Sequence, residues 1–288
     1  MNPLPDSSRP SRRQATLRRL DVEVTSRGAP LEGVLTLPTV DGSGSGTLGG
    51  DAAGARVPLV ICCHGFTDSL RGTADVADHL AGLGAATYRF TFHGGWAGAD
   101  MTDMSVLTEV DDLEAVIDAA RAGAQTRTGP WAGIDPDRIA LLGKSQGGAV
   151  AMLTAARRPE TAALVAWYPA LCIRDDLHRG LGTLDGVGET FAWMGQKLGR
   201  RYAADIWGLD VYAEIGNYPG PVLVIHGTDD SLVPVTYGER AAACYRDADF
   251  LPVPGASHGF HGADLTTVLD ATTAHLRRAG ILPSADAA

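Results

Sequence analysis

The sequence predicts an α/β fold with a mostly parallel, doubly wound sheet. Short apolar runs that fit buried strands alternate with segments of helical periodicity between residues 59 and 276. These runs are continuous, which is typical of strands covered on both faces. With 45% hydrophobic residues among 288, the chain can bury a full core. Strands and helices that alternate in this way favour a sheet with helices on both sides.

The strands are expected in order along the chain. Apolar and β-branched residues alternate over Leu20 to Val24 and over Leu31 to Pro38, which predicts two strands around a turn at Gly28. The continuously apolar runs predict further strands over residues 59–63, 85–92, 139–142, 163–167, 222–226 and 250–253.

Helices are expected between and after these strands. Apolar residues recur at helical spacing over 106–117 and 265–276, and Gly280 is expected to end the second helix. Thr236 and Glu239 follow the strand predicted at 222–226, and their spacing predicts a capping box at the start of another helix.

One interval breaks the alternation of strands and helices. About fifty residues lie between 169 and 218 before the next strand, and their aromatic content is too high for a plain loop. We expect a helical insertion here, a cap at about residues 170–218 within one domain that spans 20–288. The glycine-rich stretch between Val40 and Val57 predicts a flexible loop.

The chain begins with a basic segment. Its first 20 residues hold five arginines and one acidic residue. The pair Arg12 and Arg13 is not followed by a hydrophobic stretch, which argues against an export signal. Residues 1–19 are therefore expected to be a disordered basic tail.

Composition argues against several classes of function. The net charge is −10 and no aromatic-rich basic block is present, whereas nucleic-acid binding requires clustered lysine and arginine to neutralise phosphates. The sequence contains no run of about 18 apolar residues, which is the length that a membrane-spanning helix needs. We therefore expect a small-molecule partner and neither nucleic acid nor membrane, while a homodimer is left open.

The cysteines and other ligand-type residues predict no cofactor. Cys62, Cys63, Cys172 and Cys244 lack the spacing of a zinc site and the density of a disulfide scaffold, so we expect free, mostly buried thiols in a cytoplasmic protein. No cluster of histidine and acidic residues has metal-ligand spacing, and no dinucleotide fingerprint is present.

The strongest chemical signal surrounds Ser145. The segment Gly143-Lys144-Ser145-Gln146-Gly147-Gly148 follows a predicted strand and precedes a helix-forming stretch. A sharp turn between the two would present the serine at its apex, and the flanking glycines avoid clashes there. Ser145 is therefore predicted to be a nucleophile.

A serine nucleophile needs a base and an orienting carboxylate, and both follow at the ends of later strands. His258 lies in a glycine- and serine-flanked loop directly after a predicted strand, whereas His261 fits a helix start or the surface. Asp229 and Asp230 both follow the strand at 222–226. The order Ser, Asp, His is the one used by α/β-hydrolases.

Two backbone N–H groups are needed to stabilise the oxyanion that forms during acyl transfer. One is expected from Gln146, the residue after the nucleophile. The other is expected from Phe66, in the loop after the strand at 59–63, because the preceding Gly65 allows the backbone to approach closely.

These motifs together resemble those of the cinnamoyl (feruloyl) esterase-type serine hydrolases, which have the α/β-hydrolase fold. The matching segments are, in order, His64-Gly65-Phe66-Thr67, residues 104–112, Ser145-Gln146-Gly147-Gly148 and Gly227-Thr228-Asp229-Asp230. The resemblance implies a small cap and hydrolysis of carboxylic esters of aromatic or other small acyl groups. Through the GxxDxxVP pattern it also implies that Asp230 is the acid and Asp229 a turn residue.

Two positions depart from that family's pattern. Lys144 stands where these esterases usually have histidine, and it either packs at the sheet edge or favours an anionic part of the substrate. Residues 92–98 replace an Asn-Gly-His-Gly-like turn, and Trp96 either lines the pocket or packs under the cap. His64, Lys144 and Trp96 are predicted to bind substrate.

The sequence therefore predicts a serine esterase. Ser145 attacks an ester carbonyl, His258 transfers the proton, and Asp230 orients His258, which gives an acyl-enzyme that water hydrolyses. A thioesterase or acyltransferase of a biosynthetic pathway would use the same chemistry and is the main alternative. A non-catalytic ligand-binding protein is the other, although it would not need an intact triad.

Overall fold

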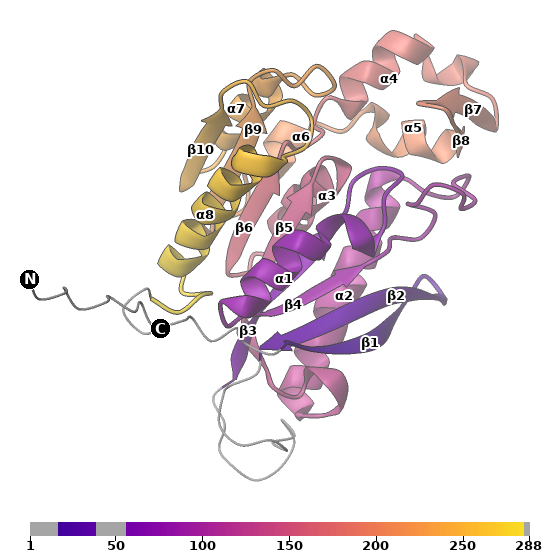
Figure 1. Ribbon diagram of the computed structural model, residues 1–288. Coiled ribbons are helices and arrows are strands. Elements are labelled where there is room, and N and C mark those ends of the chain that lie inside the picture. The colour runs from indigo at the N-terminus through magenta and orange to yellow at the C-terminus, as the bar shows by residue number, and fades with distance from the viewer. Residues whose placement is uncertain (1–16, 39–55, 285–288) are drawn as a thin grey trace, which may run out of the picture.

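One large sheet forms the centre of the structure, a computed structural model that describes residues 17–38 and 56–284 (Figure 1). Its eight strands lie in the order β1-β2-β4-β3-β5-β6-β9-β10. At one edge β1 (Leu17–Ser26) and β2 (Ala29–Pro38) form an antiparallel hairpin, and β2 pairs antiparallel with β4. All other neighbours are parallel, which confirms the predicted α/β sheet.

The parallel strands coincide with the apolar runs of the sequence. They are β3 (Val57–Cys63), β4 (Ala86–Phe90), β5 (Ile134–Lys144), β6 (Ala163–Trp167), β9 (Val222–Gly227) and β10 (Ala248–Val253). Every residue of β6 is buried, as expected for a strand covered on both faces. β5 is longer than its apolar run because Ile134 also pairs with Val57. β10 is the outer strand at the second edge and contains Pro252.

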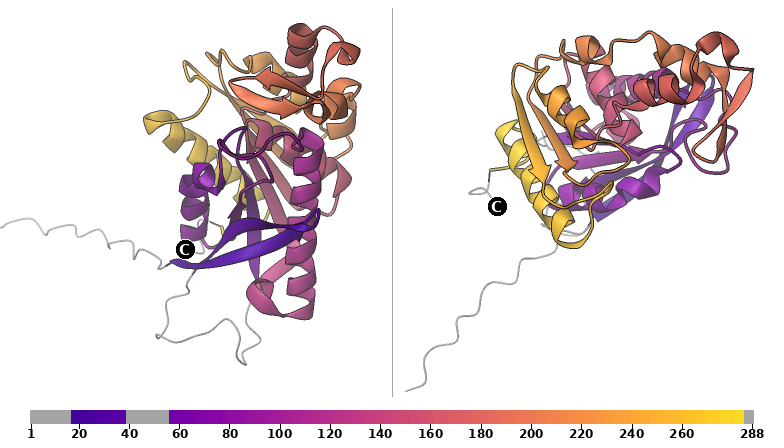
Figure 2. Two further views of the ribbon diagram at one scale, coloured as in Figure 1. Left: turned by 90° about the vertical axis from the view of Figure 1, so that its right-hand side faces the viewer. Right: turned by 90° about the horizontal axis from the view of Figure 1, so that it is seen from above.

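Helices cover both faces of the sheet (Figure 2). The apolar residues of β3 alternate between the two layers: Leu59 and Ile61 pack into one cluster, and Val60 and Cys62 into the other. The first cluster contains residues of α2 (Val106–Thr126), α3 (Gln146–Arg157) and α7 (Val235–Ala242), and the second contains residues of α1 (Ala74–Gly82) and α8 (Gly262–Arg278).

Of the two helix ends predicted from the sequence, the one at Gly280 is confirmed and the capping box is wrong. Ser105 caps α2 and accepts a hydrogen bond from the backbone N–H of Thr108 at 3.1 Å. α8 ends at Arg278, shortly before Gly280, whose φ is +70°. The capping box predicted from Thr236 and Glu239 is wrong, because α7 begins at Val235 directly after Pro234 and both residues lie inside the helix.

The chain between β6 and β9 forms an inserted segment at the carboxyl end of the sheet (Figure 1). It comprises α4 (Ile173–Leu181), the hairpin of β7 (Thr190–Trp193) and β8 (Gln196–Gly199), α5 (Arg200–Trp207) and α6 (Val211–Ile215). The helices agree with the predicted helical content of this interval. The hairpin was not expected from the sequence. Short 3-10 helices lie at Leu70–Thr73, Gly129–Trp131 and Leu184–Gly186.

Two segments predicted from the sequence lie mainly outside the described residues. The predicted basic tail and glycine-rich loop fall mostly on residues 1–16 and 39–55, which lie outside the described residues, while residues 17–19 of that tail are the first residues of β1.

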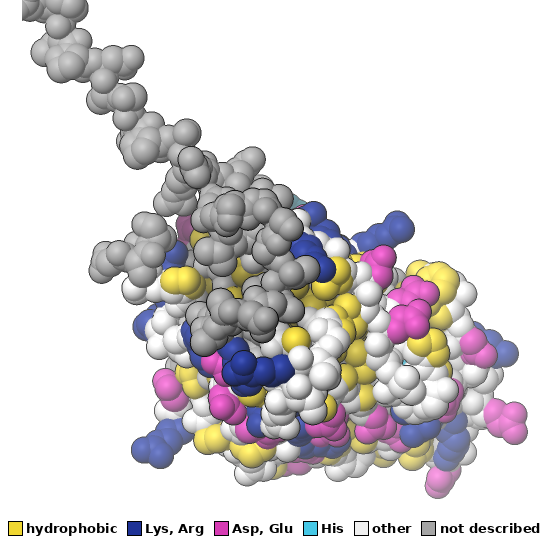
Figure 3. Space-filling view, turned by 90° about the horizontal axis from the view of Figure 1, so that it is seen from below, with side chains coloured by type: hydrophobic (Ala, Val, Ile, Leu, Met, Phe, Trp, Pro, Cys, Tyr) yellow, Lys and Arg dark blue, Asp and Glu magenta, His cyan; other side chains and the backbone are white. Residues whose placement is uncertain are grey.

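All four cysteines are free, and Cys244 alone among them is not buried. Acidic and basic side chains are interspersed over the described part of the lower face (Figure 3). Among described residues, no helix is long and apolar enough to cross a membrane.

Candidate active site

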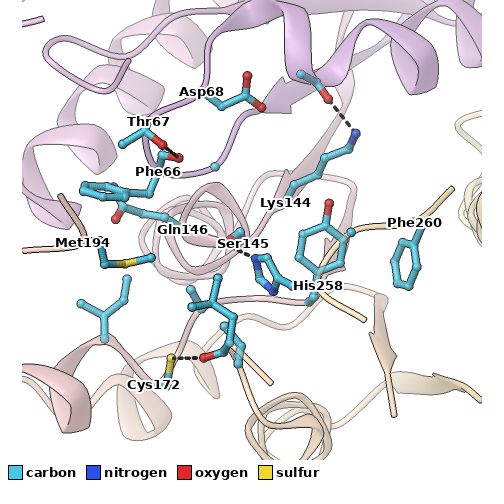
Figure 4. Close-up of a pocket in the computed structure, with 18 of the residues that line it drawn as sticks. Phe66, Thr67, Asp68, Lys144, Ser145, Gln146, Cys172, Met194, His258 and Phe260 are labelled. Carbon is cyan, nitrogen blue, oxygen red and sulfur yellow. Dashed lines mark hydrogen bonds between the residues drawn. The ribbon is translucent and has the colours of Figure 1, made fainter. Parts of the chain in front are cut away.

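Ser145 lies at the turn between β5 and α3. Its backbone has φ of 53° and ψ of −121°, a conformation that residues with side chains rarely adopt. A Cβ at Gly143 would lie 2.1 Å from the carbonyl oxygen of Gly147, and a Cβ at Gly147 would lie 2.2 Å from that of His64. Only glycine fits at both positions, so the turn closes tightly and leaves Ser145 facing the pocket (Figure 4).

The structure brings Ser145, His258 and Asp230 together from three separate loops. Ser145 Oγ lies 3.0 Å from His258 Nε2, and His258 Nδ1 lies 2.7 Å from Asp230 Oδ2. A carboxylate only accepts hydrogen bonds, so Nδ1 carries a proton and Nε2 is left to accept from the serine hydroxyl. The arrangement is a continuous line of hydrogen bonds that ends on a buried carboxylate.

Asp230 and Asp229 occupy different environments. Asp230 is 5% exposed, and its Oδ1 accepts from the backbone N–H groups of Leu232 at 2.9 Å and Val233 at 2.8 Å. Asp229 is exposed and accepts from the hydroxyl of Thr228 at 3.0 Å. The chain therefore directs Asp230 toward His258 and leaves Asp229 at the surface of the turn.

His258 and its predicted rival His261 also differ in position. His258 belongs to the loop after β10, whereas His261 is the exposed residue that precedes α8. The ring of Tyr168 packs edge-on against His258 at a centroid distance of 4.7 Å. Tyr168 was not predicted from the sequence, and its place directly after the buried strand β6 is the one signal that could have identified it.

The loop after β3 lies against the Ser145 turn. A Cβ at Gly65 would lie 3.2 Å from the Cβ of Ser145, so a larger residue would press on the serine. Gln146 is the first residue of α3, and its backbone N–H therefore has no acceptor within the helix. Among the described residues, the backbone N–H of Phe66 has no protein acceptor either. Both N–H groups are available near Ser145.

His64 does not contact the pocket, so its predicted role in substrate binding is wrong. Its side chain is 1% exposed, and its Nε2 accepts from the backbone N–H of Phe92 at 3.1 Å. Nδ1 therefore carries the proton and donates to the carbonyl oxygen of Gly65 at 2.8 Å. Burial lowers the pKa of His64, which keeps the ring neutral. His64 links the Gly65 loop to the end of β4.

Trp96 does not line the pocket, and this prediction is also wrong. Its side chain is 47% exposed and packs over Gly98, where a Cβ would lie 3.1 Å from the indole ring. Its segment is held to Thr67 by a short β-bridge and by the backbone N–H of Ala97, which donates to the carbonyl oxygen of Thr67 at 3.1 Å. This pairing holds the loop outside the pocket.

Lys144 lies in the pocket wall, but its ammonium group is bound to the protein. Nζ donates to the carbonyl oxygen of Gly72 at 2.7 Å and lies 5.0 Å from the ring centroid of Trp167. Burial lowers the pKa of Lys144, while the nearby Asp75 and Asp68 carboxylates oppose this effect. Its charge is thus partly balanced within the fold.

A pocket of about 450 Å³ opens over Ser145. Phe66 and Met194 lie on one side of the serine, and Lys144 and Phe260 lie on the other (Figure 4). The inserted segment contributes Ala170, Cys172, Ile173, Asp176, Trp193, Met194 and Tyr202 to the lining. The pocket therefore has a mostly apolar side beneath the inserted segment, with Asp176 as its charged residue, and a more polar side near Lys144. No group of residues suited to hold a metal ion occurs within 17–38 and 56–284.

The chain is similar in sequence to known hydrolases and to a mycobacterial protein. The family model described as serine aminopeptidase, S33, matches residues 55–205, which is more than half of the chain. An uncharacterized protein of Mycobacterium tuberculosis is 29% identical over 208 residues, which cover 72% of this chain and 64% of that protein. The chain thus spans less than two thirds of the length of this relative.

Solved structures share the same architecture. Est1E from Butyrivibrio proteoclasticus gives a TM-score of 0.72 at 24% identity, with 90% of this chain and 98% of that chain covered. Est1E has also been solved with ferulic acid bound. Dienelactone hydrolase from Anabaena variabilis gives a TM-score of 0.62 at 19% identity, with 91% of this chain and 98% of that chain covered. At these identities the likeness establishes a common fold.

Proposed function

Because this chain belongs to the serine aminopeptidase S33 family of α/β-hydrolases, we propose that it is a serine hydrolase that cleaves carboxylic esters through an acyl-enzyme. The observation that carries the proposal is the line of hydrogen bonds from Ser145 through His258 to Asp230 at the floor of a pocket. A nucleophile, a base and an orienting acid in this geometry are sufficient for acyl transfer.

In the first half of the reaction, Ser145 Oγ attacks the ester carbonyl carbon while its proton moves to His258 Nε2. Asp230 stabilises the imidazolium that forms. The carbonyl oxygen gains negative charge and accepts hydrogen bonds from the backbone N–H groups of Phe66 and Gln146. The C–O bond to the alcohol then breaks, and His258 gives its proton to the leaving oxygen.

In the second half, water replaces the alcohol. His258 Nε2 takes a proton from water, whose oxygen attacks the acyl carbon, and the same two N–H groups stabilise the second oxyanion. The ester oxygen of Ser145 recovers its proton from His258 as the carboxylic acid leaves. No step requires a cofactor.

We further propose that the acyl group occupies the apolar side of the pocket and that the inserted segment acts as a cap over it. Phe66 and Trp193 offer aromatic surface to an acyl group bound to Ser145. A pocket of about 450 Å³ suits an aromatic or other small acyl group. Est1E, which shares the fold, binds ferulic acid, and this supports a trial of hydroxycinnamate esters.

Hydrolysis of p-nitrophenyl acetate and methyl ferulate by wild type and Ser145→Ala tests the proposal. Loss of the nucleophile is expected to lower kcat by about 10⁴- to 10⁶-fold. Equal, slow turnover by both proteins would contradict a serine hydrolase. An acyl thioester measured at matched concentration separates an esterase from a thioesterase, because a larger acceleration over the uncatalysed reaction for the thioester would contradict ester specificity.

A further inference from the structure

A buried network of hydrogen-bonded side chains joins the inserted segment to the turn at Ser145. The hydroxyl of Tyr202 in α5 donates to Gln146 Oε1 at 2.7 Å, and Gln146 Nε2 donates to Glu109 Oε2 in α2 at 2.9 Å. These side chains are only 1–2% exposed. Both ends of the Gln146 amide are therefore held by residues far away in the sequence.

The same network of side chains also contacts the loop that contains Gly65 and Phe66. The ring of Tyr202 lies 6.0 Å from that of Phe66, measured between centroids. A Cβ at Gly95 would lie 3.1 Å from Glu109 Oε1 and 3.2 Å from Cε1 of His64, so Glu109 lies close to the histidine that anchors the Gly65 loop. Tyr202 and Glu109 thus lie beside both backbone segments that are proposed to donate to the oxyanion.

Further contacts hold α5 against the start of α2. Ser105 Oγ donates to Asp205 Oδ2 at 2.6 Å, and Arg201 pairs with Asp103 at 3.0 Å. A Cβ at Gly199 would lie 1.8 Å from the carbonyl oxygen of Thr102, so the two backbones are in close contact. This end of the inserted segment is firmly attached, and Tyr202 has a fixed position relative to Gln146.

An oxyanion donor is effective only when its N–H lies about 2.7–3.1 Å from the oxygen in the transition state. The first peptide of α3 is not held by an intrahelical hydrogen bond at its N–H. Its carbonyl oxygen, that of Ser145, accepts from the backbone N–H groups of Gly148, Ala149 and Ala170, and the Gln146 side chain adds a further constraint on its N–H side. A Gln146 side chain that is fixed at both ends therefore fine-tunes the direction of an N–H whose peptide the backbone already holds.

We propose that Glu109 and Tyr202 are positioning residues that act through the Gln146 side chain to align the Gln146 backbone N–H with the oxyanion. The inserted segment then contributes to the chemical step as well as to the pocket wall. This inference rests on the proposed serine hydrolase function. A purely structural link would lower stability and leave kcat unchanged.

Tyr202→Phe removes one hydroxyl and keeps the ring, so it tests the link directly. With p-nitrophenyl acetate we expect kcat to fall about three- to tenfold while KM stays within about twofold. Phenylboronic acid, which forms a tetrahedral adduct with the serine, should bind more weakly by about the same factor, and the product acid should bind unchanged. Tyr218→Phe is the matched control, because that buried hydroxyl donates to the carbonyl oxygen of Thr161, outside the site.

Gln146→Met keeps the backbone N–H and removes both side-chain hydrogen bonds, so it carries the test if Tyr202→Phe does not fold. It should show a similar loss of kcat, and the double variant should lose no more than the larger single loss. Wild-type kcat in the folded variants, or a change in KM alone, would overturn the inference. The proposed function would fail separately, if a fluorophosphonate probe did not label Ser145 in wild type.

Discussion

His226 Nε2 lies 3.3 Å from Asp230 Oδ2, the same oxygen that accepts from His258. Nε2 also lies 2.8 Å from the carbonyl oxygen of Val233, and since both neighbours are acceptors, Nε2 carries the proton. Burial lowers the pKa of His226, which favours a neutral ring. Both carboxylate oxygens of Asp230 therefore have donors besides His258: backbone N–H groups at Oδ1 and His226 at Oδ2. These contacts fix the orientation of the carboxylate toward His258.

Asp230→Asn is expected to lower kcat for p-nitrophenyl acetate by about 10⁴-fold, because His258 loses the acceptor that fixes its tautomer. Asp229→Asn is the matched control, since Asp229 is exposed and contacts Thr228. Its kcat should stay within about twofold of wild type. Similar losses in the two variants, measured by steady-state kinetics, would contradict the assignment of Asp230 as the acid.

Gly238→Ala is expected to destabilise the protein although alanine favours helices. In a helix interior this change otherwise gains about 1 kcal/mol. At Gly238 in α7, however, a Cβ would lie 2.4 Å from Nδ1 of the buried His226. We expect the free energy of unfolding in urea to fall by about 1–3 kcal/mol.

Gly82→Ala provides the control for this experiment. Gly82 ends α1, and no atom would lie within 4 Å of its Cβ, so this variant should be neutral or slightly stabilised. A stabilised Gly238→Ala variant would show that the His226 ring can move aside.

Glu109 should make stability depend on pH. Burial raises the pKa of Glu109 from 4.5 to about 8, with Asp112 adding to the effect and Gln146 opposing it. Between these values the unfolded chain releases the proton while the native protein keeps it, so this group lowers the free energy of unfolding as pH rises.

Glu109→Gln removes this titration and retains an acceptor for the Gln146 amide. We expect the free energy of unfolding of the variant, measured in urea from pH 5 to 8, to rise relative to that of wild type by up to about 1.4 kcal/mol per pH unit. Parallel stability curves for the two proteins would contradict a buried, titrating Glu109.

Lys144→Met is expected to leave charge selectivity almost unchanged. The Lys144 ammonium group donates to the carbonyl oxygen of Gly72 and lies near Asp68 and Asp75, so little of its charge is available to a ligand. The ratio of kcat/KM for an anionic ester to that for a neutral ester should stay within about twofold. A loss of anionic preference in the variant would instead support substrate recognition by Lys144.

The sheet was predictable because each buried parallel strand is a continuous run of apolar residues in the sequence. The apolar runs at 163–167 and 222–226 give β6 and most of β9, and the glycines around Ser145 encode the tight turn. The error at the start of α7 has a local cause, since Pro234 is the residue directly before the helix and α7 begins at Val235, one residue before the predicted box.

The roles of single polar residues were harder to predict, because they depend on partners that are distant in sequence. His64 follows a strand as a ligand-binding residue would, yet the backbone N–H of Phe92 occupies its Nε2. Lys144 finds its acceptor at Gly72. Glu109 lies in a segment that matched a family pattern, but its contact with Gln146 requires α2 and α3 to be placed in space.

Pro252 has a consequence for how copies of this protein can meet. In β10 the backbone groups of successive residues alternate between the partner strand and the free edge, and the carbonyl oxygen of Val253 accepts from Thr228 next to β9. Pro252 therefore faces outward, where it supplies no N–H. An incoming strand would lack a hydrogen bond at this point, so the edge resists the strand addition that leads to aggregation.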